Sequence, residues 1–543
     1  MQTRNIITAV IGLALGSLPC IANTTASVTA SQPSATQPSN NGDKVEGKPK
    51  ATSEEPSVTK HEITIQGSIL KYRATAGTMP MEDEQGKLKA KVFFVAYEKE
   101  TDQAIDVGPS KVDDATFGTT TSPVADPAKR PLTFVFNGGP GAAAVWLHLG
   151  TAGPRRISLE PDGQVPAPPY RLTENGYTWL DTTDLVFIDP VGTGFSRPAK
   201  DEKREQFYGT KADINWVADF IRLYVTKYER WLSPQFLAGE SYGTTRAAGL
   251  SEYLLDRYGI ALNGIILISS VLDFQTILLA QNSNDLPYIL YLPTYAASAW
   301  YHKKLSDDLQ ADLRTTLQEV ERWAIGPYVI ALAQDGSMDD VQREKVAQRL
   351  ARYTGLPVDF VRKSNLRVDP HAFQKLLLAN QGKLTGRFDA RITGFDSEPT
   401  WNYPPYDPSL SQYFAIYSTT FNDYVRRTLE YKSVLPYEVL SEKVRPWKFE
   451  EQGGKGYLSV ADNLRSAMVK NPHLKIMFAS GYFDLATPYF ATCYTVNHLN
   501  LHPELRGNIT KKFYMGGHMM YHNRASLQRL KADVAAFIRS ALH

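Results

Sequence analysis

The sequence predicts an α/β protein whose mostly parallel sheet is covered by helices on both faces. Five short apolar runs carry this prediction, because strands buried on both faces appear as continuous apolar segments and not as alternating ones. The runs are Leu132 to Phe136, Leu185 to Ile188, Phe236 to Ala238, Ile265 to Ile268 and Leu474 to Ala479. Helical patterns fall between them, as at residues 213–228 and 244–258. Such alternation is expected when helices connect parallel strands.

An amino-terminal group of strands is expected to extend this sheet at one edge. Apolar residues alternate from His61 onward, which is typical of short antiparallel strands. The residues concerned are Ile63, Ile65, Ile69 and Tyr72, followed by the run Val92 to Tyr97. We therefore place the first part of the core at residues 61–271 and its second part at residues 449–543.

Residues 272–448 interrupt the alternation and predict a helical insertion, or lid. Ser306 precedes two aspartates and an apolar face at helical spacing, which is typical of a capped helix start. Asp369-Pro370 opens another helix, which Gly382 can close. Trp401, Tyr403 and Tyr406 follow in a proline-rich stretch that predicts either a packed loop or a substrate-lining one.

The first 60 residues lie outside this core. Residues 1–22 carry one charge, Arg4, before an apolar stretch and small residues, as a secretory signal peptide does. Residues 23–60 are rich in Ser, Thr and Pro, with almost no large apolar side chains, so we expect a disordered linker. We therefore expect the protein to be exported, either to a periplasm or out of the cell. No membrane span is expected after signal removal, because no other apolar run reaches about 20 residues.

Composition and motif content exclude several classes of function. Lys and Arg together number 59 and Asp and Glu 57, with no dense basic run, so no nucleic-acid partner is expected. No His-Glu-x-x-His, Cys-x-x-Cys or acidic calcium loop occurs, so we expect neither a metal nor a cofactor. Removal of Cys20 with the signal would leave Cys493 alone and unable to form an intramolecular disulfide. No pattern indicates an oligomeric state.

A Gly-x-Ser-x-Gly motif predicts a catalytic nucleophile at Ser241. The motif spans Gly239 to Gly243, follows the strand-like run 236–238 and precedes the helical pattern 244–258. This context matches the nucleophile elbow, a sharp strand-to-helix turn that raises the serine hydroxyl above the sheet. The alternative is a serine in an ordinary packing turn.

A serine nucleophile needs a histidine base that an acid orients, in the chain order Ser, acid, His for this kind of elbow. Asp484 follows the strand-like run 474–479, and His518 follows Gly516-Gly517 at the end of the next strand-like run. These two residues are the predicted acid and base. His498, His502 and His522 are the rival histidines.

The loop Asn137-Gly-Gly-Pro-Gly141 has two interpretations. In the first, the backbone N–H groups of Gly139 and Tyr242 form an oxyanion hole. In the second, Gly139-x-Gly141-x-x-Ala144 is a dinucleotide-binding fingerprint, which requires an acidic residue at the end of the next strand. The candidate acid, Glu160, lies in a turn-like sequence, which favours the oxyanion hole.

These motifs, together with Asp189 to Ser196, resemble the serine carboxypeptidase family of the cathepsin A and carboxypeptidase Y type, in a bacterial form. The resemblance implies an α/β-hydrolase fold and hydrolysis of the last peptide bond of a substrate with a free C-terminus. It further implies that Asn137 and Glu240 hold the substrate's terminal carboxylate. Glu240 would have to be neutral for this, because two ionised carboxyls repel each other.

One departure from the family pattern bears on specificity. Relatives place a further glutamate fourteen residues after the asparagine, where this chain has Thr151. An incomplete carboxylate site leaves two alternatives open, an esterase or acyltransferase on the same scaffold and a catalytically silent binding protein.

Overall fold

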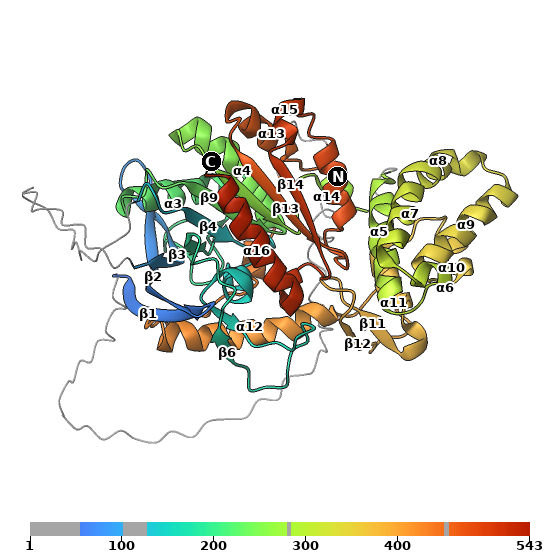
Figure 1. Ribbon diagram of the computed structural model, residues 1–543, viewed down its shortest axis with the longest axis horizontal. Helices are drawn as coiled ribbons and strands as arrows, with labels where there is room; N and C mark the ends of the chain where they lie inside the picture. The colour runs from blue at the N-terminus through green and yellow to red at the C-terminus, as the bar shows by residue number, and fades with distance from the viewer. Residues whose placement is uncertain (1–54, 101–126, 280–283, 450–455, 543) are drawn as a thin grey trace, which may run out of the picture.

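The computed structural model describes residues 55–100, 127–279, 284–449 and 456–542 (Figure 1). The signal peptide expected at residues 1–22 and most of the linker expected at 23–60 lie outside the described residues. The linker boundary is wrong, because the first strand, β1, already begins at Ser57. Its first residues are polar, and backbone pairing with the neighbouring strand, from Ser57 opposite Ala76 to Ile65 opposite Ser68, holds them at the sheet edge.

A ten-stranded sheet forms the centre of the described part of the chain, in the order β1-β2-β3-β7-β4-β9-β10-β13-β14, with β8 paired to β3. The first three strands are antiparallel, and the six from β7 to β14 are mutually parallel. Their bounds are β1 Ser57–Ile65, β2 Ser68–Glu82, β3 Leu88–Lys99, β4 Leu132–Phe136, β7 Asp184–Ile188, β8 Arg197–Pro198, β9 Gln235–Glu240, β10 Gly264–Ile268, β13 Lys475–Gly481 and β14 Ile509–Tyr514. The predicted α/β class with an antiparallel edge is confirmed.

Helices cover both faces of the sheet, because successive side chains of each strand point to opposite sides. On β4, Phe134 packs with the helices α3 (Thr210–Lys227), α4 (Tyr242–Tyr258) and α13 (Ala461–Lys470). Its neighbour Val135 packs with α12 (Pro408–Arg427) and α16 (Arg524–Ser540) on the other face. The remaining helices of the core are α2 Val145–Leu147, α14 Tyr489–Asn497 and α15 Pro503–Arg506.

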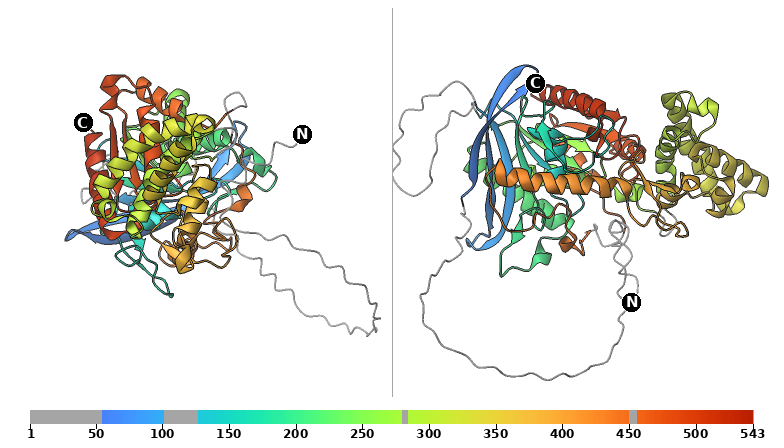
Figure 2. Two further views of the ribbon diagram at one scale, coloured as in Figure 1. Left: turned by 90° about the vertical axis from the view of Figure 1, so that its right-hand side faces the viewer. Right: turned by 90° about the horizontal axis from the view of Figure 1, so that it is seen from below.

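The insertion forms a helical body at one end of the molecule (Figures 1 and 2). Its apolar core also includes Phe483, Leu485, Tyr489 and Ala491 from the second part of the core. Its helices are α5 Leu286–Tyr301, α6 Asp307–Gln310, α7 Leu313–Trp323, α8 Val329–Gln334, α9 Asp340–Thr354, α10 Val358–Lys363 and α11 Pro370–Leu376. The single helix expected after Ser306 is two helices, since Asp312 caps α7 by accepting a hydrogen bond from Thr315 N at 2.8 Å. Asp369 caps α11 as expected, but the helix ends at Leu376, before Gly382.

One part of residues 272–448, the long helix α12, packs on the sheet and not in the helical body. The long helix α12 lies along the core in Figures 1 and 2, where Tyr413, Tyr417 and Phe421 pack into the sheet's main apolar cluster. The hairpin β11 (Lys383–Thr385) and β12 (Thr393–Phe395) lies between α11 and α12 in the chain. A second small sheet pairs β5 (Arg155–Ile157) with β6 (Leu172–Glu174).

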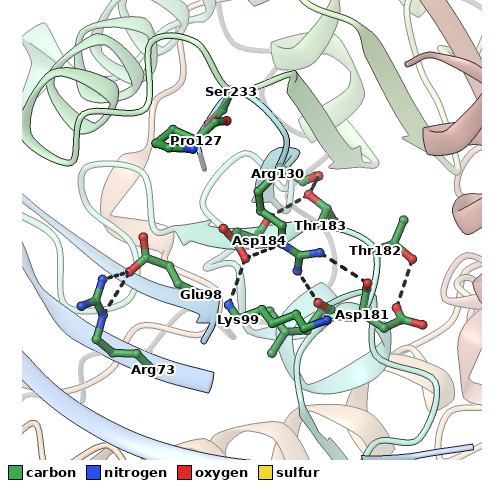
Figure 3. A network of polar contacts seen from close by, with 12 residues as sticks. Arg73, Glu98, Lys99, Pro127, Arg130, Asp181, Thr182, Thr183, Asp184 and Ser233 are labelled. Carbon is green, nitrogen blue, oxygen red and sulfur yellow. Dashed lines mark hydrogen bonds and ion pairs between the residues drawn. The ribbon is translucent and has the colours of Figure 1, made fainter. Parts of the chain in front are cut away.

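A buried network of ion pairs closes the end of the sheet where the parallel strands begin (Figure 3). Asp184, the first residue of β7, accepts from Arg130 Nε at 2.9 Å and from Arg230 Nη1 at 2.9 Å. Glu98 on β3 pairs with Arg73 at 2.6 Å and lies 3.5 Å from the same Arg230 atom. The network therefore joins β2, β3, β7 and the segment before β9, and leaves the opposite end of the strands for the site.

Candidate active site

Ser241 occupies a strained turn between β9 and α4. Its backbone has φ 60° and ψ −130°, a conformation that non-glycine residues rarely adopt. A side chain at Gly239 would overlap Gly243, and a Cβ at Gly243 would lie 2.9 Å from the carbonyl oxygen of Phe136. The two glycines therefore permit the close approach that the turn requires, and the Ser241 side chain is partly exposed above the sheet.

Asp484 and His518 meet at the same edge, because their strands β13 and β14 run parallel to β9. His518 Nδ1 lies 2.8 Å from Asp484 Oδ2. Asp484 is fully buried and also accepts hydrogen bonds from Ala486 N at 2.8 Å and from the backbone and hydroxyl of Thr487 at 3.0 and 2.8 Å. These bonds fix the carboxylate that faces the imidazole, and Ser241 and His518 line one cavity.

The electrostatic surroundings favour a charged His518. Burial lowers the pKa of His518, but the Asp484 carboxylate, with a smaller effect from Glu240, outweighs burial and raises that pKa above 6.5. The rival histidines have other environments. His522 is buried 2.8 Å from the Tyr417 hydroxyl, and burial lowers its pKa to about 3. His498 contacts the Tyr494 carbonyl on α14, and His502 precedes α15.

The loop after β4 packs against the start of α4. A Cβ at Gly138 would lie 2.6 Å from Gly243 N, so the loop backbone directly borders the amide groups of the helix's first turn. Gly139 has φ 98°, which suits glycine, and Tyr242 is the first residue of α4. Amide groups at a helix N-terminus lack partners within the helix and can bind an anion. The loop is held in turn by Asp189, which accepts from Ala144 N at 2.8 Å.

The dinucleotide interpretation of this loop is wrong. The segment after the loop forms only the three-residue α2 and a π-helical turn at His148–Ala152, not the long helix that a pyrophosphate site needs. The next strand, β5, pairs with β6 in a separate two-stranded sheet and not with β4, so it does not complete a βαβ unit with the loop. The loop borders Ser241 and Tyr242 in the same cavity.

Asn137 and Glu240 form a buried polar pair at one end of the cavity. Asn137 Nδ2 donates to Glu240 Oε1 at 2.8 Å, and Asn137 Oδ1 accepts from Leu147 N at 3.0 Å, which fixes the orientation of the amide. Glu240 is only 3% exposed. Burial raises the pKa of Glu240 to about 7, against opposing effects of His518, Tyr521 and Asn137. The carboxyl is therefore neutral in mildly acidic solution.

Tyr521 is a site residue that the sequence analysis missed. Its buried hydroxyl lies beside Glu240 and lowers the carboxyl's pKa, in a geometry that does not complete a hydrogen bond. Glu240 Oε2 is also buried and without a partner among the described residues. The two atoms lie beside each other, and Tyr521 is not among the residues that line the cavity, so Tyr521 acts on the site through Glu240. The sequence signal that could have indicated Tyr521 is its position three residues after the predicted base, His518.

Thr151 does not line the cavity. It lies fully buried in the π-helical turn, with its hydroxyl unpaired, while its carbonyl accepts from Asn175 Nδ2 at 2.6 Å.

Trp401, Tyr403 and Tyr406 are also absent from the cavity wall. Trp401 and Tyr403 are 38% and 51% exposed, with ring centroids 5.3 Å apart, whereas Tyr406 is partly buried and donates to Phe395 O at 2.8 Å. The structure therefore does not support the substrate-lining alternative, and the packed-loop alternative describes only Tyr406.

A segment of the insertion, residues 386–392, holds both loops that carry the acid and the base. Arg387 O accepts from Leu485 N at 2.9 Å, next to Asp484. Phe388 O accepts from His518 N at 2.5 Å, and Asp389 Oδ2 accepts from Gly517 N at 3.1 Å. A side chain at Gly517 would overlap this segment, which gives a second reason for the glycine before His518. These contacts join residues more than ninety positions apart, so no local sequence pattern predicts them.

Metal ligands, membrane-spanning helices and the free cysteine were the other features to consider in the described residues. No cluster of three or more potential metal ligands is found within the described ranges, and no helix there is long and apolar enough to cross a membrane. Burial raises the pKa of the free Cys493 thiol to about 11, which makes the thiol unreactive at neutral pH.

The sheet, the serine elbow and the acid and histidine at the carboxyl ends of the strands define the class of protein, an α/β-hydrolase. A family model described as serine carboxypeptidase matches residues 106–528. The chain belongs to the serine carboxypeptidase family.

Individual relatives are similar over shorter segments. Serine carboxypeptidase-like 26 of Arabidopsis thaliana is 32% identical over 165 residues, which cover 28% of this chain and 33% of that protein. A carboxypeptidase Y homolog of Arthroderma benhamiae is 32% identical over 132 residues, covering 24% of each chain. The pheromone-processing carboxypeptidase KEX1 of Coprinopsis cinerea is 31% identical over 154 residues, covering 28% of this chain and 23% of that protein. The aligned segments span a third or less of each of these relatives.

Proposed function

We propose that this protein is an exported serine carboxypeptidase that removes the C-terminal residue of peptides through an acyl-enzyme on Ser241. The observation that carries the proposal is the buried Asn137–Glu240 pair in the cavity that Ser241 and His518 line. A general esterase needs no neutral carboxyl beside its nucleophile, whereas an enzyme that binds a terminal carboxylate does. Family membership supports the same activity.

The proposed chemistry follows the order of the groups around the cavity. Ser241 Oγ attacks the carbonyl carbon of the last peptide bond, and His518 Nε2 accepts the hydroxyl proton. The N–H groups of Gly139 and Tyr242 stabilise the oxyanion of the tetrahedral intermediate. His518 then donates the proton to the leaving amine, and a water molecule hydrolyses the acyl-enzyme by the reverse sequence. Asp484 holds the Nδ1–H tautomer and stabilises the charged ring, as the 2.8 Å contact supports.

Recognition of the substrate's carboxylate falls to Asn137 and neutral Glu240. Asn137 Nδ2 and the proton of neutral Glu240 are the two donors that these cavity-lining residues present to the carboxylate. Tyr521 lies beside Glu240, but neither Tyr521 nor Thr151, which takes the position of the family's further glutamate, lines the cavity. We therefore assign Tyr521 a supporting role that it exerts through Glu240, without direct contact with the substrate.

The cellular context is part of the proposal. The amino-terminal sequence favours export to a periplasm or the extracellular space, and the unpaired Cys493 gives no reason to expect a disulfide there. The cathepsin A and carboxypeptidase Y subtype and a bacterial origin remain predictions from the sequence, as the relatives named above are plant and fungal.

A screen of blocked dipeptides tests the activity. Each dipeptide is offered as the free acid, as the C-terminal amide and as the methyl ester, and release of the terminal group is followed at pH 5.5. A carboxypeptidase hydrolyses the free acid much faster than the amide. Hydrolysis of the ester alone would support the esterase alternative, and no turnover of any substrate would support the binding-protein alternative.

A further inference from the structure

Arg387 lines the cavity wall, and its guanidinium has no hydrogen-bond or ion-pair partner among the described residues. Of the other ionisable wall residues, His518 contacts Asp484, Glu240 bonds to Asn137, and Glu442 lies 2.6 Å from Arg445. The Arg387 guanidinium lies over the Phe388 ring, with Cζ 5.7 Å from the ring centroid. A half-buried cation in a largely apolar cavity costs free energy unless an anion pairs with it.

The main chain that carries Arg387 is fixed on both sides. Arg387 N donates to Asp407 Oδ1 at 3.1 Å, and Arg387 O accepts from Leu485 N at 2.9 Å. The next residue, Phe388, accepts from His518 N. The guanidinium is thus presented from a rigid segment, as a binding group should be. Its positive charge also acts on the active centre, since it lowers the pKa of His518, against the larger effect of Asp484.

Arg387 and the Asn137–Glu240 pair belong to different ends of the cavity. Asn137 and Glu240 lie at the ends of the neighbouring strands β4 and β9, whereas Arg387 is bonded to the loop after β13. β13 lies two strands beyond β9 in the sheet, a displacement of roughly 10 Å at about 4.8 Å per strand. In a peptide bound with its terminal carboxylate at Glu240, the scissile carbonyl, which belongs to the penultimate residue, lies at Ser241. The penultimate residue would therefore extend toward Arg387, since one extended residue spans about 3.5 Å.

We propose that Arg387 is a specificity-determining residue that binds the carboxylate of an aspartate or glutamate side chain at the penultimate position of the substrate, P1. A guanidinium offers two parallel N–H donors to a carboxylate, which gives the strongest kind of charge-assisted pair. The assignment rests on the proposed carboxypeptidase function and adds the substrate class to it.

The test compares kcat/KM for blocked dipeptides with Glu, Gln or Lys at P1 and one constant terminal residue. The parent enzyme should prefer Glu to Gln by about 10- to 100-fold, with Lys the poorest. Arg387→Met should abolish the Glu preference and change hydrolysis of the Gln peptide less than threefold. Arg387→Lys keeps the positive charge but loses the two parallel N–H donors of the guanidinium, so it should retain part of the preference for Glu. Arg314→Met, an equal charge change on the exposed surface of α7, is the matched control and should leave the preference intact.

Several results would overturn the assignment. Arg387 would not bind the P1 side chain if the parent hydrolysed the Glu and Gln peptides at equal rates. The same conclusion would follow if a folded Arg387→Met enzyme kept the preference for Glu. A parallel series with Glu at the terminal position separates the two ends, because a preference found only there and dependent on Arg387 would place the cation at P1′. Failure to hydrolyse any free-acid dipeptide, the Gln peptide included, would instead contradict the carboxypeptidase proposal, and this assignment with it.

Discussion

The pH dependence of carboxylate recognition tests the role of Glu240 quantitatively. With a pKa of about 7 for Glu240, about nine-tenths of the protein has this carboxyl neutral at pH 6 and about a hundredth at pH 9. Ionised Glu240 repels the carboxylate that it should bind. The ratio of kcat/KM for a free-acid peptide to that for its amide should therefore be constant below pH 6 and fall roughly a hundredfold by pH 9.

The ratio isolates Glu240 from the catalytic base. Deprotonation of His518 is required for both substrates, so its raised pKa affects both profiles equally and cancels. The amide profile alone should rise with pH until His518 is deprotonated. Glu240→Gln keeps a neutral donor and does not titrate, so its ratio should be independent of pH. A parent ratio that stays flat from pH 5 to 9, or a Glu240→Gln ratio that falls like the parent's, would refute the reasoning.

The same carboxyl should influence stability in a defined direction. Its folded pKa of about 7 lies above the ordinary value of 4.5, so the folded state binds this proton more tightly than the unfolded state. The stabilisation is complete below pH 4.5 and is lost as pH rises through 7. The free energy of unfolding of Glu240→Gln relative to the parent should thus rise by roughly 3 kcal/mol between pH 4 and pH 8. Urea titrations at the two pH values measure it, and a constant difference would contradict the pKa.

Three further predictions concern other residues. Asp484→Asn should lower kcat by about ten-thousandfold at neutral pH, because the amide can favour the wrong tautomer of His518; a rate equal to the parent's would place the acid elsewhere. Arg230→Met should lower the free energy of unfolding by about 3 to 5 kcal/mol in urea titrations, since it leaves Asp184 and Glu98 with less compensation in a buried site; a loss below 1 kcal/mol would contradict this. Reductant should leave the melting temperature unchanged, because Cys493 is a free thiol; a reductant-sensitive dimer on a denaturing gel would show an intermolecular bridge.

The parts of the site that the sequence predicted are those with local signals. Gly239 and Gly243 flank the serine because a strand-to-helix turn leaves no room for side chains, and this requirement is visible in five residues. Asp484 follows the apolar strand β13 and His518 follows β14, and parallel strands bring their carboxyl ends to one edge. The structure places these two side chains 2.8 Å apart, as the strand order requires.

The parts that the sequence did not predict depend on contacts between distant segments. Arg387 and Asp389 reach the catalytic loops from a region assigned wholly to a lid, because the fold of residues 386–392 is determined by its partners around Phe483 and His518. The resemblance to the family pointed to position 151 as part of the carboxylate site. Thr151 instead lies in a buried turn, and this placement depends on packing between distant segments. The polar strand at Ser57 escaped notice because an edge strand held by backbone pairing needs few apolar side chains.

The most direct test of the proposed carboxypeptidase activity is the pattern of products released from an unblocked peptide. A peptide of about ten residues with a free C-terminus is incubated with the parent enzyme and with Ser241→Ala, and the products are followed by mass spectrometry at pH 5.5. The account predicts successive loss of single residues from the C-terminus in the parent, and in Ser241→Ala a rate lower by the order of a million-fold, as for loss of a catalytic serine in a comparable hydrolase. Internal cleavage by the parent, or C-terminal trimming by Ser241→Ala at more than about a tenth of the parent rate, would contradict it.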